Sequence, residues 1–557
     1  PWSPGALKKC DKNGFPWPAK AGLDIRPKLW YPDGDTNLKR TSVRPERMTP
    51  MQLQDALKTI GEASYRLKKF GELSSIGSYD MTATAPKGAA KRRAELLSFV
   101  RAESRKTLLA PETLEAVETL AAHEGELSPE MKGELRLYRR RINAVTGLPE
   151  TLLQRQSALK SATEQLWIEN KYTGDYAGVK AGMKEMIELQ KEADAILAAR
   201  PGGKSPAHPL DPVIDGTDPG MTVAKLEPLF DEIRSRTVPL LQKIAGTGWQ
   251  PDRSFTKGGF DTGIQREVAL KLLAAVGYNP RYGVVGTGEH PCTYGVNRYD
   301  VRFTDHFYPD DLLQGTISAM HEGGHGMYEQ NVSEDYLDLL IGGGSHGGMH
   351  ESSSRFWENM VGRSEAFWDY AAPLFKEAFP GRLREVPARD FFLAVNRVQP
   401  SLVRIYADEL TYNLHIMMRF EIEKMLFDGS LSADDLEDAW NEKSRAYLGI
   451  VPEKPWEGWA QDMHWPAGMF GYFQSYTIGT LNAAQIGAAV KKALPDFDGL
   501  IRAGEFAPIR AWLTEHWYRH GMLWDNDTLL RKITGEPLSA GYLCDYLEEK
   551  FSAIYGV

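Results

Sequence analysis

His321-Glu322-Gly323-Gly324-His325 has the form H-E-x-x-H. On an α-helix, residues four positions apart lie on one face, so His321 and His325 can present two imidazole nitrogens to a single metal ion. Glu322 follows the first histidine and can reach a water at that metal as a general base. The stretch predicts a hydrolytic metal site. The alternative is that the two histidines lie on the surface of an ordinary helix. A third ligand at the right distance would distinguish a metal site from this alternative.

The residues before and inside this motif predict a helix with one crowded turn. Pro309-Asp310-Asp311 is typical of a helix start, with a proline first and two acids in the first turn. Gly323 and Gly324 each cost about 1 kcal/mol of helix stability relative to alanine. Either they are merely tolerated, or another segment comes close to this turn. For that segment we expect the strand that carries Arg302, or the substrate.

Residues 299–304 (Tyr-Asp-Val-Arg-Phe-Thr) have a clear period of two. Val301 and Phe303 alternate with polar residues, which predicts a half-buried strand just before the metal helix. In many zinc peptidases, an edge strand in this place pairs with an extended peptide substrate. We therefore expect an edge strand beside the helix.

A candidate third ligand follows the glycine-rich loop 341–349, which lets the chain turn tightly. Glu351, in His350-Glu351-Ser352, begins the next predicted helix. Two histidines from one helix and a glutamate from the next make a catalytic zinc set with one open position. Glu358 is the local competitor for third ligand.

The composition, 42% hydrophobic and 25% charged, is that of a globular protein. The net charge of −9, without a block of Lys or Arg, argues against a nucleic-acid partner. No run of 18 apolar residues predicts a membrane span. Cys10, Cys292 and Cys544 do not suggest a disulfide framework and fit a reducing compartment. We expect a cytoplasmic location, although export before loss of a segment ahead of Pro1 stays open.

A chain of 557 residues can form two domains or one large helical body with lobes. Residues 1–46 are rich in Pro, Gly, Trp and Lys without a sustained period, and predict an irregular N-terminal extension. Residues 150–199 are typical of a helical hairpin broken near Gly174. The Pro/Gly/Asp-rich connection 200–220 predicts the end of an N-terminal helical lobe at about residue 215, with the metal-bearing catalytic part after it.

Five motifs in order resemble those of the M32 metallocarboxypeptidases, the thermostable carboxypeptidase 1 or carboxypeptidase Taq group. They are D-x-R-x-T at 300–304, H-E-x-x-H at 321–325, H-E-S at 350–352, [IV]-R-x-x-A-D at 403–408 and G-x-x-Q-D-x-H-W at 458–465. Weaker likeness extends from about residue 50 to the C-terminus. Tyr79, Cys292 and Ser353 stand where the family usually has Trp, Phe and Gln.

The resemblance implies a fold, a cofactor and partners. The fold is mainly α, a large helical body over residues 47–557 with a deep central groove and a small β-sheet beside the HExxH helix. The cofactor is one divalent metal ion held by His321, His325 and Glu351, zinc by default, with cobalt also accepted. The partners are a peptide substrate with a free C-terminal carboxylate and a second copy of the chain in a homodimer.

The same likeness implies catalytic roles. Glu322 takes a proton from water as it attacks the scissile carbonyl and passes it to the leaving amine. A tyrosine or histidine usually helps to stabilise the oxyanion. Tyr476 and His464 are the first candidates, with Tyr472 and His290 behind them.

Recognition of a free chain end needs a cation, best supplied by an arginine. The motifs place Arg302 on the strand and Arg404 on a later helix, and the resemblance assigns this role to both. Arg404 can alternatively pair with Asp408, four residues on. Gln461 and His290 complete the expected substrate-binding residues, although Gln461 can instead brace its own loop.

We therefore expect a carboxypeptidase that removes single C-terminal residues from peptides. One alternative is a zinc endo-oligopeptidase of similar helical shape. Another is a catalytically silent peptide-binding protein, whose signature would be a broken ligand set.

Overall fold

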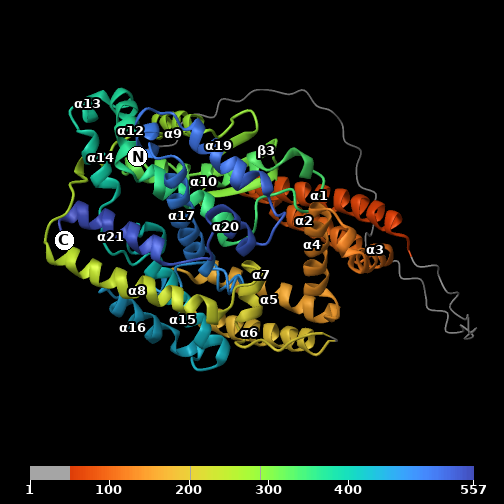
Figure 1. Cartoon of the computed structure of the whole chain (residues 1–557). Helices are drawn as coiled ribbons and strands as arrows, with labels where there is room; N and C mark the ends of the chain where they lie inside the picture. Colours follow the sequence, from red (N-terminus) through yellow and green to blue (C-terminus); the bar gives the residue numbers. More distant parts are fainter. Residues whose placement is uncertain (1–50, 201, 289) are drawn as a thin grey trace, which may run out of the picture. The chain divides into compact units, whose positions relative to one another are not determined.

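The computed structural model describes residues 51–200, 202–288 and 290–557 (Figure 1). The expected extension 1–46 lies outside this part, and the division near residue 215 stays a prediction. The described chain is mainly helical with one small sheet, which confirms the fold class. The deep groove stays a prediction. In the described residues, no helix has an apolar stretch long enough to cross a bilayer.

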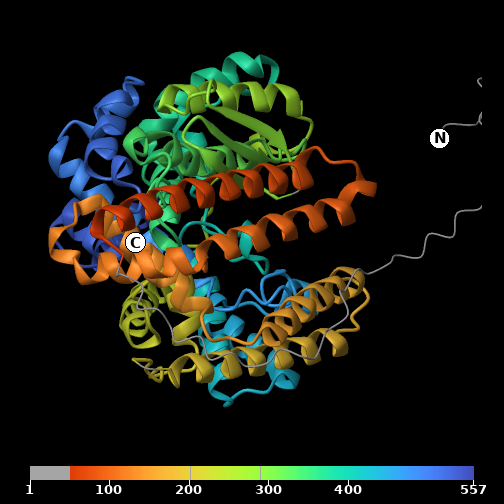
Figure 2. The same ribbon diagram turned by 90° about the vertical axis from the view of Figure 1, so that its right-hand side faces the viewer.

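Residues 51–200 contain helices and connecting turns and no strand. In Figure 2, α1 and α2 lie side by side as a long hairpin in red and orange. The expected hairpin over 150–199 is confirmed as α5 and α6, which pack together. The helices of this part are α1 Leu53–Ala83, α2 Ala90–Leu108, α3 Pro111–Ala122, α4 Pro129–Val145, α5 Glu150–Asn170 and α6 Ala177–Ala198.

The sheet has three strands in the order β1-β3-β2. These are β1 Gly283–Thr287, β2 Cys292–Asn297 and β3 Asp300–Asp305, and they follow the helices α7 Asp211–Thr217, α8 Val223–Gly246 and α9 Thr262–Val276. β3 is the expected strand, but it pairs with β1 in parallel and with β2 in antiparallel. The expectation of an edge strand is therefore wrong for residues 300–305, because both sides of β3 are already hydrogen-bonded.

The metal motif lies in α10, Leu312–Asn331, which packs against β3 and β2. The helix begins three residues later than Pro309. Asp311 is its N-cap, and the carboxylate accepts hydrogen bonds from the N–H groups of Leu313 and Gln314. Most of α10 is buried, so the structure places the motif inside the molecule and not on a surface helix.

α11, Gly348–Arg355, runs directly into a π-helical turn, Phe356–Gly362. The remaining helices are α12 Glu365–Ala378, α13 Pro380–Leu383, α14 Ala388–Val395, α15 Tyr412–Asp428, α16 Leu436–Leu448, α17 Gln474–Ala493, α18 Phe497–Arg502, α19 Ala507–His516, α20 Asn526–Thr534 and α21 Gly541–Tyr555. The buried Trp357 and Trp368 anchor the apolar core around α10 and α12. A second core joins α6, α8, α15, α17 and α21.

The two glycines of the metal motif face other helices. A Cβ at Gly324 would lie 2.7 Å from the Ser353 carbonyl oxygen and from the Ser354 Cα. A Cβ at Gly323 would overlap the Leu273 side chain of α9. The close segment is thus α11, with α9 beside it, and the expectation that the strand of Arg302 takes this place is wrong.

Gly324→Ala is expected to destabilise the fold although alanine favours helices by about 1 kcal/mol. The atoms in the way belong to the α11 backbone and not to the end of a flexible side chain, and overpacking costs about 1–3 kcal/mol. We expect a net loss in the free energy of urea unfolding. The matched control is Gly61→Ala in α1, where a Cβ meets nothing within 4 Å; it should raise stability. Equal effects of both substitutions would contradict the packing argument.

Candidate metal centre

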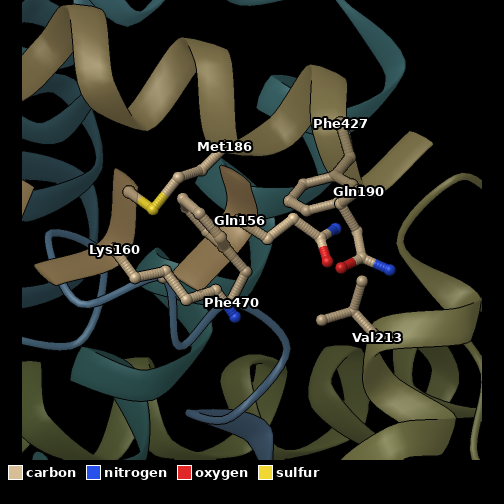
Figure 3. Close-up of a pocket in the computed structure, with 8 residues that line it drawn as sticks. Gln156, Lys160, Met186, Gln190, Val213, Phe427 and Phe470 are labelled. Carbon is tan, nitrogen blue, oxygen red and sulfur yellow. The ribbon is translucent and has the colours of Figure 1, made fainter. Parts of the chain in front are cut away.

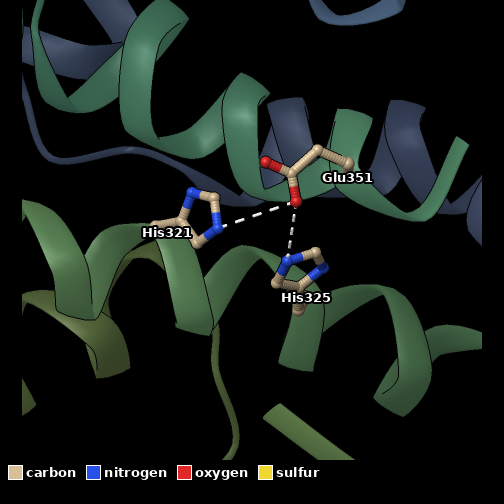
Figure 4. A group of neighbouring side chains, drawn as sticks. All are labelled: His321, His325 and Glu351. Carbon is tan, nitrogen blue, oxygen red and sulfur yellow. Dashed lines mark ion pairs between the residues drawn. The ribbon is translucent and has the colours of Figure 1, made fainter. Parts of the chain in front are cut away.

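His321, His325 and Glu351 meet at one point between α10 and α11 (Figure 4). The Glu351 Oε2 lies 3.7 Å from the His321 Nε2 and 3.2 Å from the His325 Nε2. Ligand atoms about 2.0–2.1 Å from a tetrahedral metal lie about 3.4 Å from one another. In the described part of the chain, no other group of three His, Cys, Asp or Glu is close enough to hold an ion. The three side chains therefore fit a metal ion.

Each of these three side chains has a partner on the side away from the meeting point. The His321 Nδ1 lies 2.9 Å from the Glu358 Oε2, and the His325 Nδ1 lies 2.7 Å from the His350 Nδ1. Such partners fix which ring nitrogen is free for the metal. In Glu351, Oε1 accepts a hydrogen bond from the Arg355 Nε at 2.8 Å, which leaves Oε2 free. Glu358, the alternative ligand, instead lies behind His321.

The charges around this point favour binding of a cation. Burial lowers the pKa of His325 to about 4, so its ring is neutral at pH 7 with a free lone pair. Burial opposes ionisation of His321, but Glu351 and Glu358 raise its pKa, so a positive charge is favoured at this point. Burial opposes ionisation of Glu351 as well, but the charges of His321 and Arg355 hold the pKa of its carboxyl well below the usual range. Neutral imidazole and ionised carboxylate are the forms that bind metals.

Glu322 lies beside this group without joining it. Its side chain is 5% exposed, and its Oε2 accepts a hydrogen bond from the Thr293 hydroxyl of β2 at 2.6 Å. Burial raises the pKa of Glu322, against the opposing effects of His321 and Thr293. A carboxylate with a raised pKa accepts protons more readily than an exposed one.

Arg404 lies in a buried cluster of opposite charges. Its guanidinium donates to Asp462, with Nη2–Oδ1 at 2.8 Å, and Asp462 also accepts from Arg419 at 2.6 Å. The expected helix is wrong here: Arg404 lies in a short 3-10 turn, Arg404–Tyr406. The alternative pairing with Asp408 is also wrong, because that carboxylate binds Thr411 and the Gln399 N–H.

Tyr476 and His464 belong to the same cluster. The Tyr476 hydroxyl lies 3.3 Å from the His464 Nε2, and the Arg404 guanidinium lies 5.0 Å from the centre of the Tyr476 ring. Burial lowers the pKa of His464 to about 3, so its ring is neutral. Tyr472 packs edge-on against Tyr476 and is partly exposed.

Arg302, Gln461 and His290 lie in different surroundings. Arg302 makes a bidentate ion pair with Asp300, at 2.7 and 2.6 Å. Gln461 donates to three carbonyl groups of neighbouring loops and accepts the Arg404 N–H, so its amide braces the turn of Arg404. His290 is exposed, and its carbonyl accepts from the Thr304 hydroxyl.

Several residues around the site carry little signal in the sequence. Arg355 follows Glu351 by one helical turn and could have been found by that spacing. Glu358 was expected only as a competing ligand, and its place behind His321 was not; it lies in the π-helical turn Phe356–Gly362, a form that is frequent at functional sites. Thr293 and Arg419 come from distant segments, and no local pattern indicates them.

Two cavities elsewhere do not resemble a hydrolytic site. One, lined by α5, α6, α7, α15 and the loop before α17, has a volume of about 20 Å³, which is room for about one water (Figure 3). The other, about 500 Å³ beside α9 and β1, is lined mainly by apolar side chains with Arg266 and Lys271, and by no acid or histidine.

The fold and the site define a helical metallopeptidase whose candidate ligands come from two packed helices, α10 and α11. The model of the family Carboxypeptidase Taq (M32) metallopeptidase matches residues 59–551. The chain belongs to this family and is a metallocarboxypeptidase, which implies a divalent metal ion and peptide substrates.

Curated relatives and solved structures that resemble this chain are carboxypeptidases as well. The chain is 34% identical to carboxypeptidase 1 of Bacillus subtilis, over 88% of this chain and 97% of the relative. It is 35% identical to thermostable carboxypeptidase 1 of Thermus thermophilus, over 91% and 100%. The solved structure of the M32 carboxypeptidase from Deinococcus radiodurans R1 is 31% identical, with a TM-score of 0.85, over 90% of this chain and 100% of that one.

Proposed function

We propose that the protein removes single residues from the free C-terminus of peptides, with Glu322 as the general base. A bound divalent ion supplies the activation of water and a positive charge near the developing oxyanion. Glu322 accepts the proton of the attacking water and passes it to the leaving amine. Its burial and its bond to Thr293 hold the carboxylate beside the three ligands. The Tyr476 hydroxyl donates to the oxyanion, with His464 as its neighbour.

The observation that carries the proposal is the excess positive charge of the buried cluster around Arg404. Two buried guanidinium groups, Arg404 and Arg419, share the single carboxylate of Asp462. An additional carboxylate, such as the end of a peptide, balances this charge and can accept hydrogen bonds from an arginine fork. Arg302 is already matched by Asp300, so we assign recognition of the chain end first to Arg404 and then to Arg302. The Gln461 side chain supports Arg404 by accepting a hydrogen bond from its backbone N–H.

Zinc is the proposed metal because two histidines and a glutamate are a common catalytic zinc set, and cobalt is expected to replace it. Affinity alone does not select the metal in a cell, so elemental analysis of protein purified without added metal is the direct measurement. The homodimer and the cytoplasmic location stay predictions.

Amidation of the peptide C-terminus is expected to abolish cleavage. An amide is neutral and leaves the excess charge at Arg404 unbalanced, so the loss should appear mainly in kcat/KM. The measurement compares free-acid and amidated forms of one peptide by mass spectrometry. Cleavage of the amidated form at internal bonds would favour an endo-oligopeptidase. Bound metal without hydrolysis across a peptide panel would favour a silent peptide-binding protein.

A further inference from the structure

Asp218 lies where three segments meet, away from the metal ligands themselves. It is the C-cap of α7, directly after Thr217, and only 1% of its surface is exposed. Its N–H donates to the Ile214 carbonyl at 2.8 Å, and its own carbonyl accepts the Met221 N–H at 3.0 Å. The backbone is therefore held on both sides, and the side chain extends from a fixed turn.

The carboxylate of Asp218 binds the first turns of two other helices. Its Oδ1 accepts the N–H of Gly348, the first residue of α11, at 2.5 Å. Its Oδ2 accepts the hydroxyl of Ser475, the second residue of α17, also at 2.5 Å. The first N–H groups of a helix have no partner within it, and a negative charge there is favourable. A single side chain thus ties the starts of α11 and α17 together.

These two helices carry residues that the reaction needs. Glu351 lies in the first turn of α11, and Tyr476 directly follows Ser475 in α17. The helices also touch behind the metal ligand, because a Cβ at Gly479 would overlap the Glu351 side chain. A shift of either helix start would change where the Glu351 carboxylate and the Tyr476 hydroxyl lie relative to each other.

The contact around Asp218 leaves no room for adjustment. Gly347 has a φ of +57°, and a Cβ there would overlap the Asp218 carboxylate. A Cβ at Gly348 would overlap the Ile478 side chain of α17. The glycines let the backbone of α11 reach the carboxylate directly, which is the arrangement that a fixed joint requires.

We propose that Asp218 is a positioning residue of this enzyme, which holds α11 and α17 so that Glu351 and Tyr476 face the same metal site. The inference rests on the proposed roles of Glu351 and Tyr476. It assigns a function to the turn after α7, which no motif of the sequence indicates. Asp218 acts by offering two acceptors to two donors, and it touches neither metal nor substrate.

The test measures Zn²⁺ affinity by competition with a chelator, and kcat and KM at saturating Zn²⁺. Asp218→Ala leaves both helix starts without their partner, and should weaken Zn²⁺ binding by about 10-fold or more, the range seen when a supporting residue is lost. kcat should fall as well. Asp218→Asn should restore most of both, since its oxygen can accept from Gly348 and its NH₂ can donate to the Ser475 oxygen.

The matched control is Asp525→Ala. Asp525 also accepts a backbone N–H and a hydroxyl, at 2.9 and 2.8 Å, but both come from Thr528 within the single helix α20. The control should lower the unfolding midpoint and leave Zn²⁺ affinity unchanged. Wild-type affinity and kcat in Asp218→Ala, or equal loss of affinity in Asp525→Ala, would overturn the inference.

Ser475→Ala tests the bond between Asp218 and α17 by itself. This variant still tests the inference if Asp218→Ala does not fold. It removes the α17 donor and leaves the bond to Gly348, so kcat should fall while Zn²⁺ affinity stays near the wild-type value. An unchanged kcat in Ser475→Ala would show that the bond from Asp218 to α17 does not position Tyr476. A wild-type chain that binds no Zn²⁺ would instead refute the proposed zinc site, and a metal-loaded wild-type chain that does not hydrolyse free-acid peptides would refute the proposed function, so these failures are distinguishable from failure of the inference.

Discussion

Glu322→Gln is expected to keep its metal and to lose about 10²- to 10⁴-fold in kcat, the range that general acid–base catalysis contributes. The glutamine amide has nearly the same shape as the carboxylate but cannot accept a proton. Glu322 is not one of the three groups that meet at the candidate metal position. Metal content, measured by elemental analysis, should therefore equal that of the wild type, while hydrolysis of a free-acid peptide nearly stops.

The control for this substitution is Thr293→Val. The Thr293 hydroxyl donates to the Glu322 Oε2 at 2.6 Å and to its carbonyl oxygen at 3.2 Å. Valine removes these bonds but leaves the carboxylate in place, so a smaller loss of kcat is expected. Wild-type turnover in Glu322→Gln would exclude Glu322 as the base, and loss of metal would make it a ligand.

Glu351→Gln is expected to weaken metal binding more strongly than substitution of any residue that supports the three candidate ligands. A neutral amide, whose NH₂ has no lone pair for a metal ion, replaces a carboxylate whose pKa is held low by His321 and Arg355 against the effect of burial. Glutamine is chosen because its oxygen can still accept from Arg355 (Nε–Oε1, 2.8 Å), so the buried guanidinium keeps its partner. The dissociation constant for Zn²⁺, from chelator competition, should rise beyond the 10- to 100-fold or so that loss of a supporting residue costs.

Glu358→Gln is the comparison. Glu358 lies 2.9 Å from the His321 Nδ1, on the side of the ring away from the metal position. Its substitution should stay within the range of about 10- to 100-fold for a supporting residue. The reverse order, with Glu358→Gln the more damaging, would make Glu358 the third ligand and Glu351 its support.

The local pattern was sufficient to predict the candidate metal group and the elements that carry it, with Glu358 left as a competing third ligand. Residues four apart on a helix must share a face, so His321 and His325 could be paired from the sequence. The period of two at Val301 and Phe303 predicted β3, and the break near Gly174 predicted the hairpin of α5 and α6.

Contacts between residues far apart in the sequence could not be predicted from local patterns. The strand order β1-β3-β2 depends on how distant segments pair, so the central place of β3 was missed. Arg404 and Asp462 are far apart in sequence, and the arginine was assigned to a helix with Asp408 as its alternative partner. The crowding at Gly324 was expected, but its source, the backbone of α11, was not.

The sequence by itself determined that His321 and His325 share a helix face, that Glu322 lies next to the first of them, that Glu351 starts a following helix, and that the chain is mainly α. These follow from helix geometry and from patterns within a few turns. Only the tertiary structure decided which side of each ligand is free, which carboxylate stands behind His321, and that Asp218 joins α11 to α17. Those facts depend on the packing of segments far apart in the chain, where no sequence spacing fixes the distance between two side chains.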